Sequence, residues 1–206
     1  VKEEKVLLLA LESENDKNIR DAVVSLLKAC IQSRVKVENL ATFDLEYIFL
    51  NIRAVSVGEI VEMNVVCNDD EETNVRYNLN LTDVNVVFPE GHSNKIMLTD
   101  STGVVMKYPS MDGFVQGQFS NKDFDVIDVI ASSIDQIFQE EEVYDESTTT
   151  KKEFVQFVES LTNSQLEKIQ AFFETSPRLE HTFKVTNPNT GVESEYTLRG
   201  LQSFFG

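Results

Sequence analysis

Two segments far apart in the chain share a pattern that would suit a pair of metal-binding turns. In each segment an alternating apolar run enters a short polar turn and returns as a second alternating run, which is typical of a β-hairpin. The first turn begins at Cys67 and the second at Asn187. A structural zinc site needs four Cys or His ligands, and a C-x-x-C pair at each turn would supply them. The two segments therefore resemble zinc knuckles.

Most of the ligand positions hold residues that do not build a zinc site. Cys67 is the cysteine of the first turn, and the other positions hold Asp70, Asn187 and Thr190. We therefore expect no zinc, no other metal ion and no cofactor. Structural zinc supplies an apparent ~10–16 kcal/mol to small zinc domains. Hairpins without it must be stabilised by packing on the helical core.

Other residues whose side chains could bind a metal or take part in catalysis form no recognisable catalytic set. The turn at residues 69–72 could hold calcium, but it lacks the D-x-D-x-D-G spacing, which favours a solvated turn. His92 and His181 have no motif-level Ser or Cys partner, so no triad is indicated. Asp123 and Asp125 could act as glycosidase carboxylates, yet a place near a helix N-terminus explains them as well. We expect no catalytic residues.

The elements around these residues predict an α+β fold that begins with helices. The breaker-free apolar run of residues 1–11 predicts one helix. Ser13 offers a cap for a second helix with a single buried stripe that includes Cys30. Residues 43–57 are apolar on nearly every side, which predicts a helix buried all round, and Gly58 is well placed to end it.

The middle of the chain is expected to be β-rich and the last part helical again. From Glu59 to about Pro109 the apolar period is two, which predicts a small, mostly antiparallel sheet. After a cap at Asn121, apolar residues keep helical spacing through Phe138, and the acidic run that follows predicts a fraying helix end. Two capping boxes, Thr150 with Glu153 and Thr162 with Gln165, predict the starts of the last two helices. Pro177 is expected to end the second of these helices.

These boundaries divide the chain into parts that we expect to form one compact unit. They are a helical part over 1–58, a β-rich part with the first hairpin over 59–120, and a helical part with the second hairpin over 121–206. The chain starts at Val1 in what reads as the middle of an element, so we expect further N-terminal residues to precede it.

The composition limits the classes of partner. The 206 residues include 35 acidic and 18 basic side chains, which gives a formal charge of −17. Such a surface repels phosphate backbones, so we expect no nucleic-acid binding, and it would attract a basic protein partner. A merely soluble acidic surface explains the charge equally. No apolar run is long enough to span a membrane, and the 2 cysteines fit a reducing compartment.

The C-terminal segment is a candidate contact surface. Leu201, Phe204 and Phe205 place apolar side chains at the very end of the sequence, and burying each would contribute roughly 1.5–3 kcal/mol. They could pack on their own domain or dock on a partner. Tyr47 and Arg53, on the expected third helix, complete the set of candidate partner-binding residues.

Several segments resemble the baseplate hub assembly proteins of T-even-type contractile-tailed phages. These segments are spread over essentially the whole chain. They are Val1 to Lys5 with the apolar run after it, Phe43 to Arg53, Ser56 to Glu59, Lys107 to Pro109, and Leu198 to Phe205. The resemblance implies that many members of that family have a C-x-x-C motif at both hairpins. This sequence differs from that motif at Asp70, Asn187 and Thr190.

The resemblance implies a non-enzymatic role in the cytoplasm of the infected cell. Such a protein would bind baseplate hub proteins and help them assemble before tail polymerisation, in the manner of a chaperone. Two alternatives remain open: a permanent structural subunit of the hub in the virion, and a cell-wall hydrolase that uses paired carboxylates. The sequence also allows a homo-oligomer.

Overall fold

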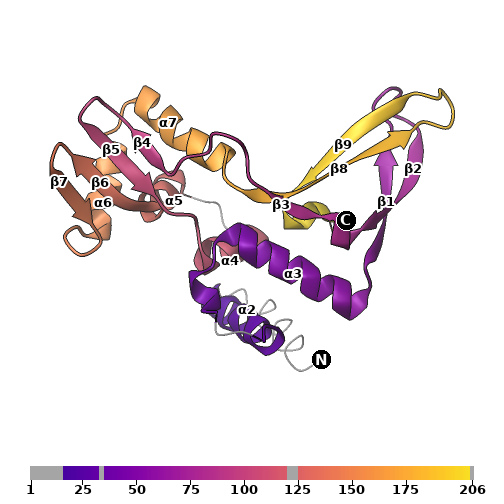
Figure 1. Ribbon diagram of the computed structural model, residues 1–206, viewed down its shortest axis with the longest axis horizontal. Coiled ribbons are helices and arrows are strands. Elements are labelled where there is room, and N and C mark those ends of the chain that lie inside the picture. The colour runs from indigo at the N-terminus through magenta and orange to yellow at the C-terminus, as the bar shows by residue number, and fades with distance from the viewer. Residues whose placement is uncertain (1–15, 33–34, 120–124, 205–206) are drawn as a thin grey trace.

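The computed structural model describes residues 16–32, 35–119 and 125–204. Within them the chain forms a helical base, an arm of two hairpins, and a lobe in which helices cover a sheet (Figure 1). The arm and the lobe lie on opposite sides of the base in Figure 1. The strand pairs are all antiparallel. The expected α+β class is therefore confirmed.

The helical base consists of α2 (Asp16–Cys30), α3 (Thr42–Val57) and α4 (Met111–Phe119). The apolar stripe of α2 is buried at Ile19, Val23 and Leu27. A hydrophobic core forms where this stripe meets α3, α4 and the C-terminal turn η3 (Leu201–Phe204). As expected, α3 ends at Gly58, which has φ 135°.

The arm consists of two hairpins. Strands β1 (Ile60–Val66) and β2 (Asn74–Asn80) form the first, and β8 (Arg178–Thr186) and β9 (Glu193–Arg199) form the second. The short β3 (Asn85–Val87) extends the second hairpin along the outer edge of β8. Figure 1 shows the two hairpins running side by side to a common tip. Both expected hairpins are confirmed.

The lobe has a four-stranded sheet with the order β4-β5-β6-β7. The strands are β4 (Lys95–Met97), β5 (Thr102–Met106), β6 (Ile134–Gln139) and β7 (Glu142–Asp145). Apolar residues on one face of the sheet pack against α5 (Val126–Ser132), α6 (Lys151–Glu159) and α7 (Asn163–Glu174) to form a second core. Both expected capping boxes are confirmed, at Thr150 and at Thr162.

The chain between Val126 and Glu146 differs from the expectation. Spacing predicted that one helix continues through Ile134, Ile137 and Phe138, but α5 ends at Ser132 and the following residues form the β6–β7 hairpin. β-Branched and aromatic side chains suit a strand, and pairing with β5 buries two of them against α6 and α7. The acidic residues after Phe138 therefore form a tight turn and not a fraying helix end.

Three other expectations need correction. Cys30 is exposed at the C-terminal end of α2, although Leu27 before it and Ile31 after it pack in the core. Helix α3 is not buried all round, since Val55 is 88 % and Val57 69 % exposed. The β-rich part forms three separate sheets where one was expected. The expected first helix, the Ser13 cap and the Asn121 cap lie outside the described residues.

Candidate functional site

The two turns at the tip of the arm have the same backbone design. In the first, Cys67 N–H donates to Thr73 C=O at 2.8 Å and Glu71 N–H donates to Cys67 C=O at 2.9 Å. In the second, Asn187 N–H donates to Val192 C=O at 2.9 Å and Gly191 N–H donates to Asn187 C=O at 2.8 Å. The fifth residue of each turn has positive φ, 56° at Glu71 and 76° at Gly191.

The side chains at the ligand-like positions meet across the two turns. Asn187 Nδ2 lies 3.0 and 3.1 Å from the carboxylate oxygens of Asp69 and donates to Asp70 Oδ2 at 2.9 Å. Thr190 Oγ1 donates to Asp69 Oδ2 at 2.5 Å. Asn189 adds a bond to Thr73 Oγ1 at 2.9 Å. We call Cys67 together with these six residues the tip network. The six residues are Asp69, Asp70, Thr73, Asn187, Asn189 and Thr190.

The donors of the tip network stabilise two adjacent carboxylates in their charged form. The Thr73 hydroxyl and backbone N–H, followed by the Asn187 amide, lower the pKa of Asp70 far below its usual range. The Thr190 hydroxyl and then Asn187 lower the pKa of Asp69. Burial raises the pKa of the Cys67 thiol, and the two carboxylates raise it further. Neutral hydrogen-bond donors therefore occupy the place that a cation would take between the turns.

The structure joins ligand-like positions of the two turns, since Asn187 donates to Asp70 and Thr190 donates to the neighbouring Asp69. Of the four positions, only Cys67 has a Cys or His side chain. Among the described residues there is no group of three or more His, Cys, Asp or Glu side chains arranged to hold a metal ion. What the arrangement can do chemically is to tie two hairpins together by hydrogen bonds. Asn187, only 1 % exposed, is its central residue.

A small aromatic core lies between the two hairpins that carry the tip network. The rings of Tyr77 and Phe183 stack at a centroid distance of 4.0 Å and join β2 to β8. Tyr196 Oη donates to Val66 C=O at 3.0 Å and accepts from Asn68 N–H at 2.9 Å, which joins β9 to the first turn. The two hairpins therefore form one body with its own apolar centre.

The candidate partner-binding residues lie in different environments. Tyr47 is 38 % exposed on α3, and half-buried Arg53 lies on the same helix. Leu201 is 3 % and Phe204 0 % exposed, because η3 inserts both into the core of the base. Packing on their own domain therefore removes these two side chains from the surface. Phe205 lies outside the described residues.

His92, for which the sequence indicates no catalytic partner, joins three chain segments. His92 follows β3, Tyr108 follows β5, and Thr175 follows α7, and all three segments connect the lobe to the rest of the molecule (Figure 1). His92 Nδ1 lies 2.9 Å from Thr175 Oγ1, and Nε2 lies 2.8 Å from Tyr108 Oη. The ring also packs on Phe172 at 5.2 Å. No sequence signal marks this site, since the partners are 16 and 83 residues away.

The hydrogen-bond roles at His92 are fixed by its neighbours. The Thr175 hydroxyl donates to Ala171 C=O at 2.6 Å, so it can only accept from His92. Nδ1 therefore carries the proton, and Nε2 accepts from the Tyr108 hydroxyl. Burial lowers the pKa of His92, in keeping with a neutral ring. His92 therefore links the three segments by hydrogen bonds, and its Nδ1, which carries a proton, cannot act as a base toward the Thr175 hydroxyl.

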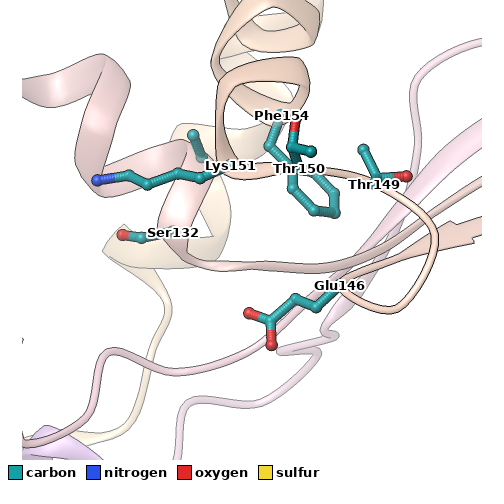
Figure 2. Close-up of a pocket in the computed structure, with 7 residues that line it drawn as sticks. Ser132, Glu146, Thr149, Thr150, Lys151 and Phe154 are labelled. Atoms are coloured by element: carbon teal, nitrogen blue, oxygen red, sulfur yellow. The ribbon is translucent and has the colours of Figure 1, made fainter.

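A shallow pocket of about 330 Å³ opens where α5 meets the start of α6 (Figure 2). Its charged side chains already have partners, because Glu146 pairs with Lys107 and Lys151 lies 3.8 Å from Asp128. Neither His nor Cys lines it. Both ion pairs are at the surface, since all four charged side chains in them are at least 36 % exposed.

Comparisons with known proteins give one family. The sequence model of the family described as "T4 bacteriophage base plate protein" matches residues 1–206. No curated protein and no solved structure matches the chain. In the part of the chain that the structure describes, no helix is both long and apolar enough to cross a membrane.

Proposed function

Since the chain belongs to the T4 bacteriophage base plate protein family, we propose that it is an assembly factor of the baseplate hub. It binds one or more hub proteins during tail morphogenesis in the host cytoplasm and keeps them competent for assembly, without making or breaking a covalent bond. The observation that carries the proposal is the family match over the whole chain.

The character of the surface supports a role in protein binding. Acidic residues exceed basic residues by 17, which favours basic protein surfaces and disfavours nucleic acid. Large apolar side chains are exposed on α3 and at the start of the arm, including Tyr47, Val55 and Ile60. Exposed apolar side chains near an acidic surface suit a partner with a basic rim and an apolar centre.

Co-expression with each hub protein of the same phage tests the proposal directly. We expect a complex that survives affinity purification and size-exclusion chromatography. A double variant, Tyr47→Ala with Arg53→Ala, should weaken that complex, whereas Val126→Ala, at an exposed site on α5, should leave it unchanged. Binding to none of the hub proteins would remove the proposal.

A permanent structural subunit of the baseplate is the second candidate, and the family match supports it equally. Quantitative mass spectrometry of purified mature phage separates the two. An assembly factor that leaves should be absent from the particle or far below the hub proteins in amount. A fixed copy number equal to that of a hub protein would identify a structural subunit.

A cell-wall hydrolase is the third and least supported candidate. A zymogram with purified peptidoglycan is the test, and we expect no clearing. Clearing that is lost on substitution of one Asp or Glu would overturn the proposed assembly role.

A further inference from the structure

The sheet of the lobe has one covered face and one open face. In the covered row, Ile96, Val104, Ile137 and Tyr144 are direct neighbours across the four strands, and the first three pack in the core. The residues on either side of this row point the opposite way. We call their surface the open sheet face; its rows are Lys95, Val105, Gln136, Asp145 and Met97, Gly103, Phe138, Val143.

One row of the open sheet face, Met97, Gly103, Phe138 and Val143, is apolar, although the face is exposed to solvent. Met97 is 44 % and Val143 53 % exposed, and neither these residues nor Val105 and Phe138 belong to a hydrophobic core among the described residues. An antiparallel sheet with one wet face normally has polar residues there. Phe138 lies over Gly103, where an added Cβ would collide with its ring, and Lys95 Nζ lies 4.8 Å from the centre of the same ring.

Backbone groups at both edges of this sheet already have partners within the chain. Lys168 Nζ donates to the carbonyl groups of Met97 and Leu98 at 3.1 and 3.2 Å, which occupies the edge of β4. On β7, Asp145 C=O accepts the N–H groups of Thr148 and Thr149 at 3.0 and 2.8 Å. Strand addition at either edge would have to displace these bonds, which favours a partner that covers the face.

The charges of the open sheet face are complementary to the same face of a second copy. Lys95 lies at the β4 end of its row and Asp145 at the β7 end. A two-fold axis along the strands, between β5 and β6, turns β4 of one copy over β7 of the other. Each Lys95 then faces Asp145 of the other copy, and each Met97 faces Val143. We propose that two copies of this chain associate through their open sheet faces.

This arrangement follows ordinary sheet packing. Two aligned sheets pack about 10 Å apart at about −30°, and isologous contact is the commonest form of dimer. The face is roughly 15 Å wide, from three spacings of about 4.8 Å, which is small for a stable dimer. The charge of −17 on each copy opposes association. The dimer is therefore weak, and added salt strengthens it by screening the repulsion.

Sedimentation equilibrium of the full chain, over a wide concentration range at low and high salt, measures this association. We expect a reversible monomer–dimer equilibrium with a dissociation constant above about 1 µM that falls as salt rises. Val143→Glu should weaken the dimer about tenfold or more by burying a charge. Ile60→Glu, at a site with 55 % exposure on the arm against 53 % for Val143, is the matched control and should dimerise like the wild type.

A charge exchange tests the register. Lys95→Glu alone and Asp145→Lys alone should each be monomeric, because each creates two like-charged contacts across the axis. Mixed together they should form a heterodimer, since both contacts then join opposite charges. Circular dichroism and thermal unfolding must first show that both variants fold, because Asp145 also accepts bonds from Ser147. A wild type that stays monomeric, or a Val143→Glu variant that dimerises normally, overturns the proposal.

Discussion

Asn187 in the β8–β9 turn donates its side-chain amide to Oδ2 of Asp70 in the β1–β2 turn, over a distance of 2.9 Å and a sequence separation of 117 residues. Both residues stand at positions where a zinc knuckle pair would have ligands. The bond shows how the tips of the two hairpins stay together without a metal ligand set: an amide at one ligand-like position donates to a carboxylate at another.

Replacing Asn187 with Ala should therefore destabilise the arm. The change leaves the carboxylates of Asp69 and Asp70 without a shared donor in a crowded site, and the loss of a buried hydrogen-bond partner costs about 2–3 kcal/mol. Urea unfolding followed by circular dichroism measures the loss. Asn64→Ala, on the exposed face of β1, is the control and should change the free energy of unfolding by less than about 0.5 kcal/mol. Equal effects would show that the network does not stabilise the fold.

A triple variant can test whether the turns retain the geometry of a zinc site. Asp70→Cys, Asn187→Cys and Thr190→Cys together would give four cysteines with Cys67. We expect this variant to bind one zinc ion tightly at neutral pH and to lose both zinc and stability on chelation. The wild type is the control and should gain no stability from zinc. A triple variant that does not respond to zinc would show that the two turns only resemble knuckles.

Glu71 provides a third prediction, because it has φ 56° where the matching residue of the other turn is Gly191. The left-handed conformation costs a residue with a Cβ roughly 1–2 kcal/mol, and Gly avoids this cost while losing some entropy on folding. Glu71→Gly should therefore raise the free energy of unfolding by about 0.5–1 kcal/mol. Glu72→Gly is the control and should not stabilise. A destabilised Glu71→Gly variant would contradict the account of the turn.

Local patterns in the sequence predicted much of this fold. Alternation identified both hairpins, the two capping boxes marked the starts of α6 and α7, and Gly58 marked the end of α3. In each case the signal lies within a few residues of the feature, and the physics that sets it is equally local.

Features that depend on distant partners were not predicted. Ile134, Ile137 and Phe138 fit helical spacing, and only pairing with β5 makes them a strand. Phe204 could have packed inward or faced a partner, and only the core of the base decides this. The candidate site was predicted in part: the turn positions were identified, but the bonds among Asp69, Asp70 and Asn187 were not, because they depend on how two hairpins meet.

The junction at His92 gives a prediction about pH. Its folded-state pKa is lowered by burial, so the unfolded chain takes up the proton first as the pH falls. Stability is therefore fully present above the unfolded pKa of about 6.5 and decreases as the pH falls from there toward the folded pKa. Unfolding free energies measured between pH 7.5 and about 5 should show this decrease.

The variant His92→Gln should reduce that pH dependence, since an amide has no titrating proton. It should also lower stability at neutral pH, because Gln cannot reproduce both bonds and the contact with Phe172. His181→Gln, which removes a histidine from the arm, is the matched control, and the decrease should persist in it. An unchanged pH profile in His92→Gln would show that the junction does not titrate in this range.

The four candidate contact residues that the structure describes divide into core and surface, which gives the last prediction. Phe204 is fully buried, so Phe204→Ala should cost about 3–5 kcal/mol through lost burial and a cavity. Tyr47→Ala should cost less than about 1 kcal/mol, because the ring is 38 % exposed on α3. Chemical unfolding measures both, and hub-protein pull-downs measure binding. At a temperature where both variants remain folded, Phe204→Ala should retain binding while Tyr47→Ala loses it. The reverse result would place the contact surface at the C-terminus and not on α3.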